Sequence, residues 1–241
     1  MSDVKTDILA VGAHPDDVEI GMGGTIALHT SRGYSTSIIN LTKAELSSNG
    51  TVETRQDEAE QAASLLGVEK LIQLDYPDRG LAECREEIVQ KLTYHIRTLR
   101  PRHVFAPGIR DRHPDHTETG RLVKEAVFNA GIQKYNPSLG GPFRPEAFWY
   151  YQINGMTDPR YVVDISTVID RKLEALQAYK SQFSSGPDTV ATPLTDAYIE
   201  RVRSREHITG QLIGVRYGEG FTSDGPLAVT NLFGSDSHEE I

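Results

Sequence analysis

Two short segments of the chain concentrate side chains that can bind a metal ion or transfer a proton. The first is Ala13–Glu19 (Ala-His-Pro-Asp-Asp-Val-Glu), which follows the apolar run Ile8–Gly12. The second is His113–His116 (His-Pro-Asp-His), which follows another strand-like run, His103–Ala106. A single His-Pro-Asp turn is commonly structural, because proline fixes φ and aspartate caps helices. Two such turns, each placed after a strand, favour one shared metal site.

The residue types in these segments suit metal-assisted hydrolysis. We take His14, Asp17 and His116 as candidate ligands, since two imidazoles and one carboxylate with an open position for water form a recurring catalytic zinc arrangement. Such a site lowers the pKa of its water towards neutrality. Asp16 could then accept the proton of that water. The sequence alone leaves open which of Asp16 and Asp17 is the ligand.

His113 and Asp115 are further candidates for the same cavity. As an imidazolium, His113 could stabilise an oxyanion or protonate a leaving amine. Asp115 could hold the His113 ring in place. The other histidines lack comparable neighbours, and we expect them in structural or surface positions: His29, His95, His103, His207 and His238.

Three arginines are candidate substrate-binding residues. Arg110 and Arg112 lie directly before the second segment, and Arg55 lies near the start of an expected helix. Bidentate contacts from arginine would suit a substrate with a carboxylate or a sugar. The alternative is that these arginines are solvated surface residues, and this alternative has most weight for Arg110.

The first half of the chain alternates between strand and helix patterns. The expected strands are Asp7–Val11, Thr36–Leu41, Lys70–Leu74 and His103–Ala106. The expected helices are Gly24–Arg32, Thr54–Leu66, Cys84–Leu99 and one that begins at Asp115 or His116 and ends at Gly131. This alternation predicts an α/β fold with a parallel sheet covered on both faces. In the order 3-2-1-4-5 the first and fourth strands are neighbours, so both His/Asp segments would leave them at the crevice where such folds bind ligands.

The pattern changes after Gly131. The expected elements are a turn-rich loop over 135–145, strands Ala147–Gln152 and Tyr161–Ile165, helices Thr167–Tyr179 and Asp196–Ile213, a loop over 183–195, and a frayed acidic end at Ser235–Ile241. Thr167 and Asp170 have capping-box spacing. We expect one domain over residues 1–241, with a core of about 1–134 and a C-terminal α/β extension of about 135–241.

Composition argues against several classes of protein. A net charge of −9 is unfavourable for nucleic-acid binding, and no apolar run approaches the roughly 18 residues that span a bilayer. Met1–Lys5 lacks the pattern of a signal peptide. Cys84 is the one cysteine, so no internal disulfide can form, and its place on an apolar helical stripe indicates a core residue rather than a nucleophile. We expect a cytoplasmic protein without nucleic-acid or membrane partners.

Alternative functions have some support in the same residues. The run Gly21–Thr25 is glycine-rich before a helix, but it lacks the G-x-G-x-x-G spacing of a nucleotide loop. A nucleotide-binding regulatory module is therefore the non-enzyme alternative. Two histidines and one aspartate also form the facial triad of non-haem iron(II) oxygenases, although the alternation of strands and helices speaks against that class.

Ala13–Asp17 together with His113–His116 resembles the LmbE-like (PIG-L) superfamily of zinc-dependent N-deacetylases. Most members carry a glutamate directly after the two aspartates, whereas here Val18 intervenes and Glu19 follows. That variant is similar to the bacillithiol-pathway branch. Further segments similar to the branch are Glu19–Ala27, Asp111–His116, Val127–Gly131, Thr192–Thr195 and Tyr217–Phe221.

The resemblance implies a Rossmann-like three-layer fold and separate roles for the two aspartates. Asp17 would bind the metal beside His14 and His116, and Asp16 would be the general base. His113 would support the oxyanion or the leaving group. The metal would be Zn2+, with Fe2+ or Mn2+ as alternatives because the same ligands accept them. The implied substrate-binding residues are Arg55, Arg112, Arg110, Glu19 and Tyr198.

The implied reaction is hydrolysis of the acetamide of N-acetylglucosaminyl L-malate, which yields glucosaminyl malate and acetate in bacillithiol biosynthesis. Arg112 and Arg110 would hold the malate carboxylates. Alternatives are deacetylation of another N-acetylglucosamine compound and hydrolysis of an amide in a thiol conjugate. Members of the branch often form homo-oligomers, including hexamers, so we expect this protein to form a homo-oligomer.

Overall fold

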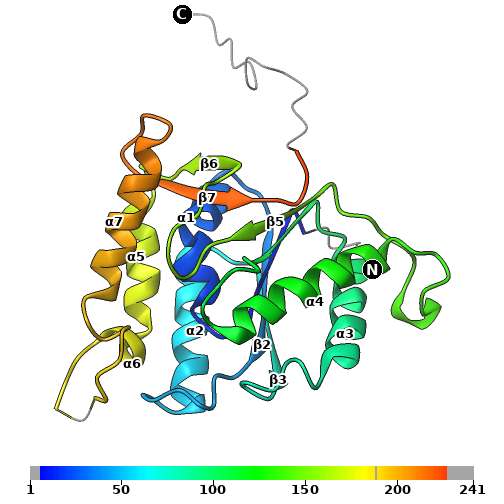
Figure 1. Cartoon of the computed structure of the whole chain (residues 1–241), viewed down its shortest axis with the longest axis horizontal. Coiled ribbons are helices and arrows are strands. Elements are labelled where there is room, and N and C mark those ends of the chain that lie inside the picture. The colour runs from blue at the N-terminus through cyan, green and yellow to red at the C-terminus, as the bar shows by residue number, and fades with distance from the viewer. Residues whose placement is uncertain (1–5, 188, 227–241) are drawn as a thin grey trace, which may run out of the picture.

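Strands from both halves of the chain form one continuous sheet in the computed structural model, which describes residues 6–187 and 189–226 (Figure 1). The strand order is β3-β2-β1-β4-β5-β7-β6. The bounds are β1 Ile8–Gly12, β2 Thr36–Thr42, β3 Lys70–Tyr76, β4 His103–Pro107, β5 Ala147–Tyr151, β6 Tyr161–Asp164 and β7 Gly218–Thr222. β1 to β5 pair in parallel, whereas β7 pairs antiparallel with both β5 and β6.

Helices cover both faces of this sheet (Figure 1). Their bounds are α1 Asp17–Ser31, α2 Val52–Leu66, α3 Arg85–Leu99, α4 Pro114–Ala130, α5 Ile169–Ala178, α6 Lys180–Phe183 and α7 Tyr198–Gln211, with a short 3-10 turn at Pro137–Leu139. Side chains alternate across a strand, so Ile38 of β2 joins the core beneath α1, α2 and α5, while Ile39 joins the core beneath α3 and α4. No helix among the described residues is long and apolar enough to cross a bilayer.

The expected α/β fold and the order of the first five strands are confirmed. The first helix begins earlier than expected, at Asp17 rather than Gly24, and it is interrupted at Met22, where φ is −151° and ψ is 20°. The glycine run therefore lies inside α1 and forms no phosphate loop. Cys84 is partly buried against the core beneath α3 and α4, as expected.

The C-terminal elements differ more from the expectation. Strand β7 was not predicted, because Gly218 and Gly220 weaken its strand pattern. The capping box at Thr167 is wrong: the N-cap of α5 is Val168, and no side chain caps it. The segment Ser235–Ile241 lies outside the described residues.

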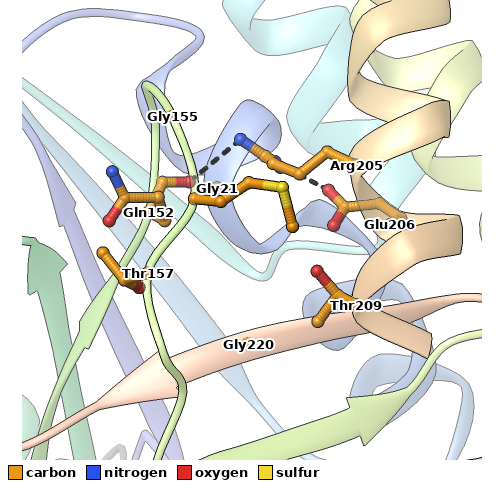
Figure 2. A pocket seen from close by; sticks show the side chains of 9 residues that line it. Gly21, Gln152, Gly155, Thr157, Arg205, Glu206, Thr209 and Gly220 are labelled. Carbon is orange, nitrogen blue, oxygen red and sulfur yellow. Dashed lines mark hydrogen bonds and ion pairs between the residues drawn. The ribbon is translucent and has the colours of Figure 1, made fainter. Parts of the chain in front are cut away.

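The C-terminal elements pack against the interruption in α1. A cavity of about 20 Å³ remains between Gly21 of α1, Gln152 after β5, and Arg205 and Glu206 of α7 (Figure 2). The packing around Gly21 leaves no room for a larger residue, since a Cβ added at this position would lie 2.1 Å from the Tyr151 ring. The start of α1, which carries the first His/Asp segment, is thus held by the C-terminal part of the chain.

Candidate active site

The two His/Asp segments meet at the carboxyl ends of β1 and β4. These strands pair in parallel, with Ile8 opposite His103, so the loops that follow them emerge side by side. The ring centroids of His14 and His116 lie 5.5 Å apart, and those of His113 and His116 lie 4.6 Å apart. The expected meeting of the two segments in space is therefore found in the structure.

Asp17 lies between the two imidazoles that the sequence proposes as ligands. Its Oδ1 is 3.0 Å from Nε2 of His116, and its Oδ2 is 3.4 Å from Nδ1 of His14. Oδ2 also accepts the backbone N–H groups of Ala13 and His14, each at 2.9 Å, at the N-terminus of α1. Burial would raise the pKa of Asp17, but His116 and His14 outweigh it and hold the pKa well below its usual range.

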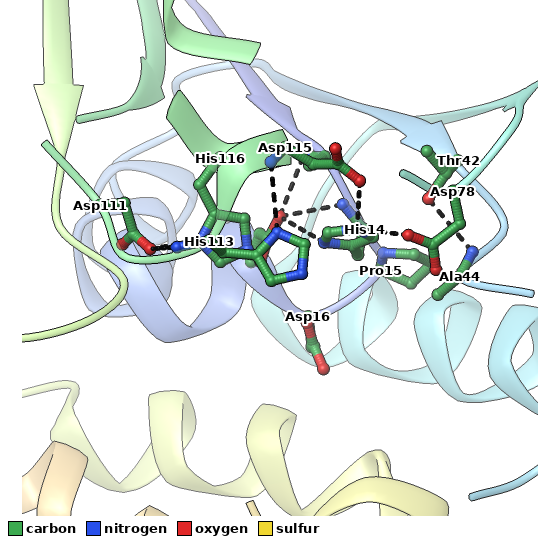
Figure 3. Close-up of polar contacts among 12 residues, drawn as sticks. His14, Pro15, Asp16, Thr42, Ala44, Asp78, Asp111, His113, Asp115 and His116 are labelled. Carbon is green, nitrogen blue, oxygen red and sulfur yellow. Dashed lines mark hydrogen bonds and ion pairs between the residues drawn. The ribbon is translucent and has the colours of Figure 1, made fainter. Parts of the chain in front are cut away.

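The opposite ring nitrogens also have carboxylate partners. Nδ1 of His116 lies 3.0 Å from Asp111, and Nε2 of His14 lies 3.3 Å from Asp78 and 3.5 Å from Asp115 (Figure 3). Carboxylates in this position fix the tautomer and orientation of a metal-binding histidine. Neither Asp111 nor Asp78 is among the residues predicted from sequence to act in the site, although Asp78 also follows the carboxyl end of a strand, β3.

This donor set fits a divalent cation. Burial alone would lower the pKa of His116, but Asp17 and Asp111 raise it to about 9. Burial likewise opposes charge on His14, yet the carboxylates around it raise its pKa well above the usual value. The carboxylates around His14 and His116 outnumber the cationic side chains there, so they favour binding of a cation at this site. Imidazole together with carboxylate is a common zinc ligand set. His14, His113 and His116 each offer a ring nitrogen within 4.8 Å of the others.

Asp16 has a different environment from Asp17. Its backbone is left-handed, with φ of 103°, a conformation that is uncommon outside glycine and often found at functional sites. In Figure 3 its side chain points away from the histidines. Arg55 lies 3.2 Å from the Asp16 carboxylate and also donates to the Pro15 carbonyl. Burial raises the pKa of Asp16 to about 6, and Arg55 opposes that rise, so the carboxylate can exchange a proton near neutral pH.

Asp115 contacts the His113 ring through its backbone and not through its carboxylate. Its carboxylate contacts His14 and the backbone N–H of Arg79, the latter at 2.8 Å, rather than the His113 ring. The ring of His113 is instead held by the backbone N–H of Asp115, which donates to Nδ1 at 3.3 Å as the N-cap contact of α4. Burial lowers the pKa of His113, which favours the neutral ring over the expected imidazolium.

These residues line a cavity of about 600 Å³. Arg55, Arg112 and Tyr198 line it, as expected, and Arg79 lines it unexpectedly. Arg110 is not among its lining residues. The cavity lining also includes uncharged polar side chains: Ser47, Ser48, Asn49, Gln182 and Thr192.

Glu19 does not fit the expected substrate contact. It is 1% exposed, is absent from the cavity lining, and accepts a hydrogen bond from the Tyr179 hydroxyl at 3.0 Å. The helical turn that presents Asp17 to the site directs Glu19 into the core beneath it. Burial raises the pKa of Glu19 to about 7.

Known proteins resemble the chain along most of its length. Diacetylchitobiose deacetylase from Thermococcus kodakarensis is 34% identical over 233 residues, which cover 91% of this chain and 83% of that protein. A relative from Bacillus anthracis named "Probable N-acetyl-alpha-D-glucosaminyl L-malate deacetylase 2" is 29% identical over 81% of this chain and 89% of its own. A 4-oxalmesaconate hydratase from Pseudomonas putida is 27% identical over 76% of each chain. The bacillithiol branch is thus one of several groups that the chain resembles.

The fold and the site segments agree with these similarities. A crystal structure of a conserved protein from Thermus thermophilus superposes with a TM-score of 0.84 at 40% identity, covering 94% of this chain and 98% of that one. The profile of the PIG-L family, described as GlcNAc-PI de-N-acetylase, matches residues 9–127, which include both His/Asp segments. The chain therefore belongs to the PIG-L family of the LmbE-like deacetylase superfamily.

Proposed function

We propose that the protein hydrolyses the acetamide of a small compound that contains N-acetylglucosamine, releasing acetate and a free amine. The observation that carries this proposal is the pairing of a cation-attracting group of imidazoles and carboxylates with a separate carboxylate, Asp16, on one cavity wall. The sequence similarity to deacetylases of N-acetyl sugars supports the choice of substrate class.

His14, Asp17 and His116 would hold the divalent cation, with Zn2+ as the first candidate and Fe2+ or Mn2+ as alternatives. When bound, such a cation supplies Lewis acidity that lowers the pKa of a water molecule and polarises the amide carbonyl. Asp16 would accept the proton of the attacking water and could return it to the departing amine. Arg55, by its charge, keeps Asp16 ionised over a wider pH range.

His113 would stabilise the charge that develops on the carbonyl oxygen. Its Nδ1 accepts the N–H of Asp115, so a neutral ring carries its proton on Nε2 and can donate there. A preorganised donor of this kind is worth a factor of about 10² to 10³ in rate at other oxyanion sites. This role requires no positive charge on the ring.

The cavity supports a sugar glycoside as substrate. Its volume of about 600 Å³ is within the range of small-molecule sites, and the hydroxyl and amide groups in its lining suit sugar hydroxyls. A second saccharide unit is therefore our first candidate for the group attached to N-acetylglucosamine. A malate aglycone is the second candidate, favoured by the exposed Arg112 on the same cavity.

Acetate release tests the proposal. Purified protein is incubated with N-acetylglucosamine, diacetylchitobiose and N-acetylglucosaminyl malate, with and without chelator, and both acetate and amine are measured. We expect release from at least one glycoside, loss of activity with chelator, and recovery with Zn2+, Fe2+ or Mn2+. Asp16→Asn should retain metal but lose most turnover. Absence of acetate from all three compounds, or full activity of Asp16→Asn, would contradict the proposal, and hydratase chemistry would release no acetate.

A further inference from the structure

The interruption of α1 separates the turn that carries Asp17 from the rest of the helix. Met22 has non-helical backbone angles, so the turn Asp17–Gly21 is not fixed by continuous helical hydrogen bonding. Backbone groups on both sides of such a break lose their helical partners and must be bound by other groups. The groups that bind them therefore determine where Asp17 lies relative to His116.

Arg205 of α7 binds the site-proximal side of this break. Its Nη2 donates to the Ile20 carbonyl at 2.6 Å, and its Nη1 donates to the carbonyls of Ile153 at 2.8 Å and Gln152 at 3.3 Å. Figure 2 shows the Arg205 side chain extending from α7 towards Gln152, next to Gly21. A planar guanidinium with five N–H donors can hold several carbonyls at once, whereas a lysine ammonium cannot span the same positions.

The segment after β5 connects Arg205 to His116, the candidate ligand from the second His/Asp segment. The backbone N–H of Asn154 donates to Asp111 at 3.1 Å, and its side-chain amide donates to the same carboxylate at 2.9 Å. Asp111 in turn lies 3.0 Å from Nδ1 of His116. One guanidinium is therefore connected to the Asp17 turn through Ile20 and to His116 through the Ile153–Asn154 segment.

Buried charges keep Arg205 in place. Glu206 accepts from Arg205 at 2.7 Å and from Lys172 at 2.6 Å, and Lys172 also contacts Glu219 at 2.6 Å. Glu219 accepts the backbone N–H groups of Gly24 and Thr25, at 2.8 and 2.6 Å, on the far side of the break. Both sides of the interrupted helix are thus bound by one charge-balanced network from α5, α7 and β7.

We propose that Arg205 is a positioning residue that holds the two ligand-bearing segments in register, so that Asp17 and His116 reach one cation. Buried ion networks contribute little net stability compared with apolar packing, so the network is better explained by the geometry it imposes. The inference rests on the proposed metal site, and it assigns Arg205 no contact with substrate.

Arg205→Lys tests the proposal, because lysine keeps the charge that faces Glu206 but loses the multiple carbonyl contacts. The affinity for Zn2+ is measured by competition with a chromophoric chelator, together with the absorption spectrum of the Co2+-substituted protein. We expect an unchanged circular dichroism spectrum, a Zn2+ dissociation constant raised about tenfold or more, and altered Co2+ bands. Arg201→Lys is the matched control, since Arg201 lies on the same helix, is exposed and pairs with Asp196. It should leave both measurements unchanged.

The outcomes separate this inference from the proposed function. A folded Arg205→Lys protein with wild-type Zn2+ affinity and Co2+ spectrum overturns the positioning role and leaves the deacetylase proposal intact. A wild-type protein that binds no divalent cation rejects the metal site itself. If Arg205→Lys does not fold, the charge-balanced pair Arg205→Gln/Glu206→Gln is used, which keeps the Lys172–Glu219 contact. Wild-type Zn2+ affinity in that protein also overturns the proposal.

Discussion

Asp111 lies 3.0 Å from Nδ1 of His116, on the side of the ring opposite to Asp17. A carboxylate there fixes the orientation of the imidazole and raises its basicity as a ligand. We expect Asp111→Asn to weaken binding of Zn2+ by about 10- to 100-fold, with little change in secondary structure. Chelator competition measures the dissociation constant. Asp75→Asn is the control, since the side chain of Asp75 is 82% exposed, and equal affinity of the two variants would refute the role of Asp111.

The charge of Arg55 should set the acid limb of the pH–rate profile. Burial raises the pKa of Asp16 to about 6, and the positive charge of Arg55 opposes that rise. Removing the charge in Arg55→Met therefore raises the pKa of Asp16, so a larger fraction of the base is protonated at a given pH. We expect the acid limb of kcat/KM to move up by about one pH unit, measured at saturating metal.

Arg55→Lys keeps the positive charge and serves as the matched variant. Its acid limb should stay close to that of the wild-type protein, even if its KM changes. If Arg55→Met and Arg55→Lys had the same acid limb of kcat/KM, that limb would reflect the ionisation of another group, or Asp16 would not be the base.

The meeting of the two His/Asp segments could be predicted from sequence because their residues follow strand ends. His14, Asp17 and His116 each follow a strand with a strong apolar pattern, and parallel strands present their carboxyl ends at one edge of the sheet. The order of the first five strands follows from the same alternation of strands and helices. These are local signals whose spatial consequence is fixed by the fold class.

The partners of these residues could not be predicted, because they depend on contacts distant in sequence. Asp78 reaches His14 from a third loop, and Arg205 reaches Ile20 across 185 positions. Glu19 was misplaced because helical periodicity directs it away from the cavity once α1 begins at Asp17. Asp115 contacts His113 through its backbone N–H, and the capping geometry of α4 determines that contact.

Gly21 should be irreplaceable for steric reasons alone. A Cβ at this position would lie 2.1 Å from Cδ2 of Tyr151, which is itself buried and donates to the Val11 carbonyl at 2.8 Å. We expect Gly21→Ala to destabilise the protein by about 1–3 kcal/mol through overpacking. Gly141→Ala is the control, because an added Cβ there meets no atom within 4 Å, and its effect should stay within about 0.5 kcal/mol. Urea unfolding measures both, and equal stability of the two variants would contradict the close packing of Gly21.

The buried network around Glu206 should make stability depend on pH. Burial alone would raise the pKa of Glu206, but Arg205 and Lys172 outweigh it and hold the pKa below 4.5. A carboxyl group whose pKa falls on folding stabilises the native state above its unfolded pKa, and that contribution is lost as the pH falls through the folded pKa. Glu206→Gln removes the charge at every pH. We therefore expect it to cost about 3 kcal/mol at neutral pH and progressively less below pH 4.5. Urea unfolding of both proteins over a pH series gives this difference, and a gap that stays constant into acid would show that Glu206 is not ionised in the folded protein.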